Sequence, residues 1–173
     1  MIYITADTHF GHSNIIRYCD RPFSSIGEMD ARLIGNINDL VQEDDILIHA
    51  GDFAFGDYNK IINYRNRIIC KNIYLIAGNH DRYIWQFRHR LANIFTQIVE
   101  YIFVKIDETF YLINHYPIKD ERKQSKVDTF NKLIKEFNPT ILYGHTHKPG
   151  IGNIGVDLTD FTPVLLGANL TRM

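Results

Sequence analysis

Five short apolar runs in this chain of 173 residues each lead directly into side chains that can bind a metal ion. The runs are Ile2–Ala6, Ile46–Ala50, Ile73–Ala77, Phe110–Ile113 and Ile141–Tyr143, followed by Asp7–His9, Gly51–Asp52, Gly78–Asp81, Asn114–His115 and Gly144–His147. Short apolar runs bounded by turn residues are typical of buried strands. Because sites in open α/β folds form beyond the carboxyl ends of strands, five such junctions predict one shared site.

The first half of the chain alternates these runs with helical patterns. Apolar residues recur at helical spacing from Met29 to Val41, and a second pattern over 58–65 follows the candidate N-cap Asp57. A third helix is predicted over Tyr83–Phe95. Strands that alternate with helices indicate βαβ units and parallel pairing.

The second half is richer in strands. A strand is predicted over Gln97–Ile106, with a hairpin into Thr109–Asn114. A late helix carries Phe130 and Phe137 on its apolar face. A capping box at Ser125 and Asp128 predicts the start of this helix, and Asn138–Pro139 predicts its end. Short strands are predicted near Thr140–Tyr143, Asn153–Val156 and Val164–Gly167. We expect an α/β fold: a four-layer α/β/β/α sandwich of two mixed sheets flanked by helices, formed as a single domain over residues 1–173.

Composition narrows the functional classes. The net charge is −1, so no global basic field indicates nucleic acid as a partner. No apolar run approaches the roughly 20 residues that span a bilayer, and no secretory signal is evident. Cys19 and Cys70 form no disulfide framework and are interpreted as free thiols. A cytoplasmic protein without a membrane partner is expected.

The polar residues at the junctions have the chemistry of transition-metal ligands. The seven candidates are Asp7, His9, Asp52, Asn79, His115, His145 and His147. Mixed imidazole, amide and carboxylate donors suit Mn, Fe, Zn or Co better than Ca, and the absence of cysteine disfavours a structural zinc site. Seven ligands exceed the needs of one ion, whereas two ions that share a bridging carboxylate use them well. Two divalent ions, two aspartates and a hydroxide leave a net positive centre, which favours a phosphate anion as substrate.

The order of these motifs resembles the calcineurin-like metallophosphoesterase superfamily. The matching blocks are Asp7-x-His9, Gly51-Asp52, Gly78-Asn79-His80-Asp81, His115 and Gly144-His145-x-His147. The segment Asp7–Ile16, together with Arg21–Phe23, resembles a branch of small bacterial and phage phosphoesterases. The resemblance runs from residue 7 to residue 147 and implies a metal-dependent phosphoric ester hydrolase.

The resemblance also implies individual roles. Asp7, His9 and His147 would hold one ion, Asn79, His115 and His145 the other, and Asp52 would bridge them through both carboxylate oxygens. A metal-bridging hydroxide would attack phosphorus in line, with Mn²⁺ as the expected ion and Fe, Zn, Co or Ni as alternatives. His80 would act at the leaving group, and Asp81 would orient His80. His49 precedes the ligand position inside its strand and is interpreted as a core residue or as a residue that supports the ligands, and not as a ligand itself.

Substrate contacts are predicted for His12, Arg17, Arg21 and Arg82. His12 could instead make local loop hydrogen bonds, and an arginine is more often part of a surface ion pair. Arg82–Arg90 interleaves basic and aromatic residues, which suits a nucleotide but also fits an ordinary amphipathic helix. The charged segment Lys119–Lys126 is a further candidate for substrate recognition.

Three functional hypotheses follow. The leading one is a phosphoesterase acting on small phosphomonoesters or phosphodiesters, with a nucleotide among the candidate substrates. A nuclease acting on polymeric nucleic acid is less favoured because the chain lacks a strong basic face. A non-catalytic binding scaffold on the same fold is the third, although every ligand position keeps a competent residue. The sequence leaves the oligomeric state open.

Overall fold

The larger of the two sheets has five strands in a computed structural model that describes residues 1–118 and 127–167. Its strands are β1 (Ile2–Thr5), β2 (Ile46–His49), β3 (Asn72–Ile76), β4 (Gln97–Val99) and β8 (Val164–Leu165), in the order β4-β3-β2-β1-β8. The pairs among β1 to β4 are parallel and β8 is antiparallel to β1. The carboxyl ends of β1 to β4 therefore meet at one edge.

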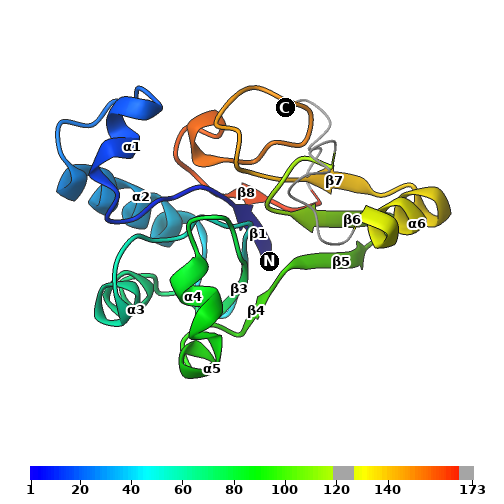
Figure 1. Cartoon of the computed structure of the whole chain (residues 1–173), viewed down its shortest axis with the longest axis horizontal. Helices are drawn as coiled ribbons and strands as arrows, with labels where there is room; N and C mark the ends of the chain where they lie inside the picture. Colours follow the sequence, from blue (N-terminus) through cyan, green and yellow to red (C-terminus); the bar gives the residue numbers. More distant parts are fainter. Residues whose placement is uncertain (119–126, 168–173) are drawn as a thin grey trace.

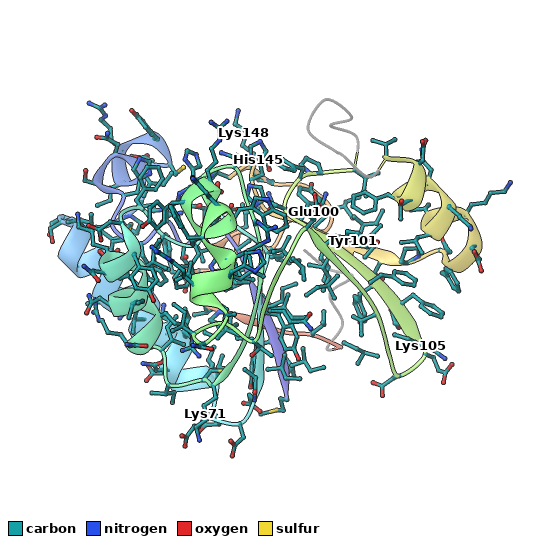
Figure 2. All side chains as sticks on the ribbon, turned by 60° about the horizontal axis from the view of Figure 1, so that its bottom comes forward. Lys71, Glu100, Tyr101, Lys105, His145 and Lys148 are labelled. Atoms are coloured by element: carbon teal, nitrogen blue, oxygen red, sulfur yellow. The ribbon has the colours of Figure 1, made fainter. Side chains whose placement is uncertain are left out.

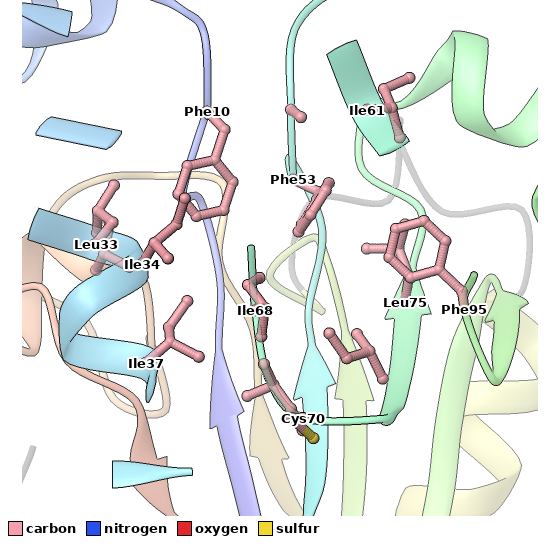
Figure 3. Packing of buried hydrophobic residues seen from close by; sticks show 14 of the residues in the cluster. Phe10, Leu33, Ile34, Ile37, Phe53, Ile61, Ile68, Cys70, Leu75 and Phe95 are labelled. Atoms are coloured by element: carbon pink, nitrogen blue, oxygen red, sulfur yellow. The ribbon is translucent and has the colours of Figure 1, made fainter. Parts of the chain in front are cut away.

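Helices cover one face of this sheet. They are α1 (Ser13–Tyr18), α2 (Ile26–Leu40), α3 (Tyr58–Asn66), α4 (Arg82–Gln86) and α5 (Arg88–Leu91). The Ser25 hydroxyl accepts the Glu28 N–H at the start of α2, a cap that was not predicted. Asp57 accepts the Lys60 N–H at the start of α3, as predicted. Figure 3 shows Leu33, Ile34 and Ile37 pointing from α2 into the main core cluster.

The second sheet has three strands, β5 (Tyr101–Ile106), β6 (Thr109–Asn114) and β7 (Thr140–Leu142), in the order β5-β6-β7. α6 (Val127–Phe137) packs on its outer face, where the Phe137 ring lies 5.2 Å from that of Phe103 and 4.9 Å from that of Phe110. A second apolar cluster fills the space between the sheets; it includes Ile4, Ile48, Ile76, Tyr111, Ile113 and Leu142. Figure 1 shows α6 at the opposite end of the molecule from α2 and α3. The predicted four-layer sandwich of two mixed sheets is confirmed.

Three local predictions were wrong. The strand expected over Gln97–Ile106 is interrupted at Glu100, so that β4 pairs with β3 in one sheet and β5 with β6 in the other. The helix expected over Tyr83–Phe95 is two short helices that meet at Phe87. The segment expected to be a strand over Asn153–Val156 makes isolated bridges through Asn153 and Gly155 and then enters a 3₁₀ helix, η2 (Val156–Leu158).

The predicted capping box cannot be compared with the structure, whereas the prediction of free cysteines is confirmed. The capping residue Ser125 lies outside the described residues. Cys19 and Cys70 are both free, as predicted, with Cys70 buried in the main core. Among the described residues, no helix has the length and apolarity that a bilayer crossing needs.

Replacing Leu33 by Ala should lower the free energy of unfolding by about 2–5 kcal/mol, because the side chain is fully buried and its loss leaves a cavity. Leu40 lies on the same helix with 41% of its surface exposed, so Leu40→Ala should change stability by less than about 0.5 kcal/mol. Denaturant titration of both variants measures the difference. Equal losses in the two variants would contradict the assignment of α2 to the core.

Candidate metal centre

Loops from both sheets meet at one end of the molecule. Asp7 and Asp52 follow β1 and β2, and His115 follows β6. The loops are joined by backbone hydrogen bonds: the Asp7 N–H donates to the Gly51 carbonyl at 2.9 Å, and the Gly144 N–H to that of His115 at 3.1 Å. In Figure 2, His145 lies at the end of the molecule opposite Lys71, which precedes β3. The polar junctions therefore converge, as predicted.

Five of the seven candidate ligands have a left-handed backbone. Their φ angles are 59° for Asp7, 52° for His9, 56° for Asp52, 71° for His145 and 51° for His147. Non-glycine residues pay roughly 1–3 kcal/mol for such a conformation, and it persists only where the surrounding structure enforces it. Strain gathered in these residues indicates that the fold maintains their geometry for a purpose other than stability.

The first group of candidate ligands is Asp7, His9 and His147, whose ligand atoms all lie within 4.8 Å of one another. The Nε2 atoms of His9 and His147 are 3.3 Å apart. His147 Nδ1 donates to Asp157 Oδ2 at 2.6 Å, which directs its Nε2 toward the group. The Asp7 carboxylate accepts the His145 N–H, at 2.8 Å to Oδ2. Three donor atoms thus face one another in a buried space.

The second group is Asp52, His115 and His145, again within 4.8 Å. His115 Nδ1 donates to the Ala50 carbonyl at 2.9 Å, so in the neutral imidazole Nε2 carries a lone pair. That nitrogen lies 3.1 Å from Asn79 Oδ1, another acceptor. Lone pairs that converge without a proton between them are the arrangement that a cation stabilises. The two groups match the division that the resemblance implies, and metal ligation itself stays a prediction.

Asp52 lies between the groups. Its Oδ2 is 3.5 Å from His9 Nε2 in the first group and 3.5 Å from His115 Nε2 in the second. Its Oδ1 instead accepts the His80 N–H at 2.8 Å. Oδ2 is thus the Asp52 oxygen that lies near both groups, and the expectation that both carboxylate oxygens bridge two ions stays a prediction.

Motif glycines allow the ligands to pack this closely. A Cβ at Gly78 would lie 2.2 Å from Asp52 Oδ1, and one at Gly51 would lie 2.4 Å from His115 Nδ1. A Cβ at Gly144 would lie 2.6 Å from Asp7 Oδ2. Side chains at these positions would displace the ligands. Together with the convergent lone pairs, this cradle fits two divalent cations bound by nitrogen and oxygen donors.

The pKa values show electrostatic conflict within the cluster. Burial raises the pKa of Asp7 to about 6, with the charge of Asp52 adding to the effect and those of His115 and His147 opposing it. Burial also lowers the pKa of His9, and positive charge on His147 lowers it further. For His147 burial favours a low pKa, but hydrogen bonds to Asp157 and Cys19 and the charge of Asp7 raise it to about 10. A bound cation would stabilise Asp7 as a carboxylate and His147 as a neutral ligand.

Asp81 has a different role from the one expected. Its carboxylate accepts the backbone N–H groups of Asp52 at 2.7 Å, Gly78 at 2.9 Å and Phe53 at 3.0 Å. Burial raises its pKa to about 6, and the nearby charge of Asp52 adds to the shift. Both oxygens accept backbone N–H groups of the loops after β2 and β3, so Asp81 holds the loop that carries Asp52 and is not bonded to the His80 ring through these contacts.

His80 lies at the exposed margin of the cluster. Its ring centroid is 5.2 Å from that of His9, 5.1 Å from that of Phe55 and 6.0 Å from that of His12. It belongs to neither group of candidate ligands. An exposed imidazole beside the cluster is free to meet a substrate.

The four predicted substrate contacts differ in placement. His12 stacks on Phe55, with centroids 4.1 Å apart, beside His80. Arg17 and Arg82 are exposed, in α1 and at the start of α4. The predicted substrate contact of Arg21 was wrong. Its side chain is fully buried and paired with Asp157, so it cannot reach a substrate in solvent. The segment Lys119–Lys126 lies outside the described residues.

His49 and Asp157 are two further residues near the candidate ligands. His49 is fully buried and lies 2.9 Å from the Thr8 hydroxyl through Nε2, which agrees with its interpretation as a core residue. Asp157 was not predicted, because it belongs to no motif and acts through contacts with residues distant in the chain. An unassigned acidic residue shortly after Gly144–His147 was the only sequence signal for it.

The fold and its loops define a two-sheet α/β protein with two groups of candidate metal ligands at one end. A model of the calcineurin-like phosphoesterase superfamily domain matches residues 1–165, and the chain belongs to that superfamily. Membership confirms the resemblance and the expected class, a hydrolase of phosphoesters.

One relative is similar in sequence and two solved structures are similar in fold. An uncharacterized protein of Methanocaldococcus jannaschii is 32% identical over 179 residues, covering 95% of this chain and 86% of that protein. A protein of unknown function from Aquifex aeolicus superposes with a TM-score of 0.74 at 26% identity, covering 95% of this chain and 94% of that one. A novel archaeal phosphodiesterase superposes with a TM-score of 0.50 at 22% identity, covering 95% and 81%, and shows likeness of fold alone.

Replacing Gly78 by Ala should abolish binding of Mn²⁺ at the cluster, because the new methyl group would collide with the Asp52 carboxylate. A methyl group at Gly35 on α2 would meet nothing within 4 Å, so Gly35→Ala should leave metal binding intact and stabilise the helix by up to about 1 kcal/mol. Metal content after dialysis, measured by mass spectrometry, compares the two variants. Retention of metal by Gly78→Ala at the parent level would refute the steric cradle.

Proposed function

We propose that the chain is a dinuclear metal-dependent phosphoesterase that hydrolyses phosphomonoesters or phosphodiesters. The observation that carries this proposal is the position of Asp52 Oδ2, which is 3.5 Å from His9 Nε2 and 3.5 Å from His115 Nε2. One carboxylate oxygen shared by two groups of ligands suits two ions better than one. Mn²⁺ is the proposed ion, with Fe, Zn, Co or Ni as alternatives, because the donors mix imidazole nitrogen with oxygen.

When bound, two such ions supply Lewis-acid stabilisation of the phosphoryl oxygens and acidify a water for in-line attack. The protein's own residues supply the rest. His80 is exposed beside the cluster, and we assign it proton donation to the leaving oxygen or hydrogen bonding to the transition state. Its backbone N–H holds Asp52 Oδ1, which ties its position to the bridge.

The substrate we propose is a small phosphoester with an aromatic or nucleobase group. His12 lies on Phe55 next to His80, and the Tyr18 ring is 6.3 Å from that of His12. Tyr18 is 64% exposed, with the Arg17 guanidinium 5.5 Å from its ring centroid. Exposed aromatic and cationic groups favour stacking of a base beside its phosphate. A polymeric nucleic acid is not favoured at a net charge of −1. Cytoplasmic location stays a prediction.

Replacing Asp52 by Asn should reduce Mn²⁺-dependent hydrolysis of an aryl phosphodiester by at least about 10³-fold, since loss of the bridging charge disrupts both proposed ion sites. His80→Ala should keep bound metal and lose about 10²–10⁴-fold in kcat, the usual contribution of a general acid. Metal content and steady-state kinetics separate the two effects. Parent-level turnover in both variants would contradict the roles assigned to Asp52 and His80, whereas no turnover by the parent with any divalent metal would support the binding scaffold.

Tyr18→Ala should raise KM for nucleoside phosphodiesters by about 5- to 150-fold, the equivalent of the roughly 1–3 kcal/mol that base stacking contributes. The KM for a methyl phosphodiester should be unchanged, and Tyr18→Phe should behave like the parent. The same panel should include phosphomonoesters, cyclic nucleotides and oligonucleotides with several metals. Preferential cleavage of oligonucleotides by the parent would favour the nuclease, and an equal effect on all substrates would exclude stacking at Tyr18.

A further inference from the structure

Arg21 is the most completely enclosed cation near the cluster. It lies between α1 and α2, and its side chain has 0% exposure. Its guanidinium pairs with Asp157 in two places, Nε to Oδ1 at 2.7 Å and Nη2 to Oδ2 at 3.0 Å. Burial of a charged pair offers little stability in itself, because desolvation offsets the attraction. The pair therefore calls for an explanation beyond packing.

The same guanidinium holds the backbone of the first ligand loop. Nη2 donates to the Asp7 carbonyl at 2.7 Å, and Nη1 donates to the Thr8 carbonyl at 3.1 Å. Asp7 has a left-handed φ of 59°, and so does His9, at 52°. Arg21 thus contacts the backbone where the chain is strained, and its rigid fork of donors fixes the direction of the two carbonyls.

On its other side, the pair controls His147. Asp157 Oδ2 accepts the Nδ1 proton of His147 at 2.6 Å. This hydrogen bond selects the tautomer and rotation in which His147 Nε2 lies 3.3 Å from His9 Nε2. Asp157 and Cys19 also come within 4.8 Å of a His147 ligand atom, but both Asp157 oxygens are already bonded to Arg21. Asp157 is accordingly a residue that acts through His147, not a ligand.

We propose that Arg21 and Asp157 form a positioning pair that presents Asp7 and His147 to the first ion, an inference that rests on the proposed dinuclear function. The pair joins segments that are 136 residues apart in the chain and are brought together only by the fold. Its opposite charges cancel, so Asp157 orients the imidazole without adding net negative charge beside Asp7 and Asp52. In the second group, His115 is oriented by the Ala50 carbonyl and not by Asp157.

The test compares Asp157→Asn, Arg21→Lys and Arg21→Met with the parent by calorimetric titration of the metal-free proteins with Mn²⁺. Loss of a contact that orients a metal ligand typically weakens affinity about 10- to 100-fold. We expect that loss at one of two sites in Asp157→Asn and Arg21→Met, and a smaller loss in Arg21→Lys, which keeps the charge without the fork of donors. At one equivalent of Mn²⁺, electron paramagnetic resonance should show one occupied site in each variant, and the spectrum of that site should be the same in all variants.

Arg65→Met is the matched control. Arg65 is also a buried arginine, with 8% exposure, and donates to the carbonyls of Ile94, Ile68 and Lys71, away from the cluster. It should lower thermal stability and leave both Mn²⁺ affinities at parent values, which separates general destabilisation from positioning. Circular dichroism establishes that each variant is folded; if Arg21→Met is not, Asp157→Asn and Arg21→Lys decide the outcome.

The outcomes distinguish the two proposals. Two parent sites with unchanged affinities in folded Asp157→Asn and Arg21→Lys would overturn the positioning pair and leave the dinuclear function standing. Weakening of both sites equally, or the same weakening in Arg65→Met, would also overturn it. A parent chain that binds no Mn²⁺, Fe²⁺, Zn²⁺, Co²⁺ or Ni²⁺ would overturn the dinuclear function and the pair with it.

Discussion

The buried carboxylate of Asp81 is the contact on which the geometry of the centre depends. It collects backbone N–H groups from the loops after β2 and β3, including that of Asp52 at 2.7 Å. Buried N–H groups without acceptors cost about 1–3 kcal/mol each, so these loops have a strong preference for this one arrangement. The Asp7 carboxylate acts similarly on the loop after β7 through the His145 N–H. Aspartates in this centre therefore organise backbone as well as offering charge.

The two-sheet architecture explains why such contacts are needed. Asp7, Asp52 and Asn79 come from the five-stranded sheet, whereas His115, His145 and His147 come from loops of the three-stranded sheet. The apolar cluster between the sheets, with Ile4, Ile48 and Ile113 among its members, sets their separation. A small shift of one sheet against the other would separate the two halves of each ligand group. The inter-sheet core thus helps to hold the candidate ligands together, although it consists of apolar side chains.

The sequence predicted the layers and the convergence of the ligands well, because each signal is local: an apolar run followed by a polar motif. Its errors arose where tertiary contacts decide. The run Gln97–Ile106 has the same strand pattern throughout, and only pairing with β3 or β6 divides it at Glu100. The sequence allowed Asp81 to bond either to His80 or to the neighbouring loops. It bonds to the loops because their buried N–H groups need acceptors. Arg21 looked like a surface cation because its partner Asp157 is 136 residues away.

Strain and stability are spatially separated in this molecule. The left-handed residues Asp7, Asp52 and His147 lie in the loops at one end, whereas the largest buried side chains, such as Phe53 and Leu33, lie in the core beneath. Conformations that cost roughly 1–3 kcal/mol each can persist there because the strands that precede them are fixed by packing, and the loops by hydrogen bonds to buried carboxylates. Binding of cations would release part of the electrostatic conflict among the same residues. Burial of apolar surface elsewhere in the fold supplies the free energy that maintains the strained arrangement of the candidate ligands.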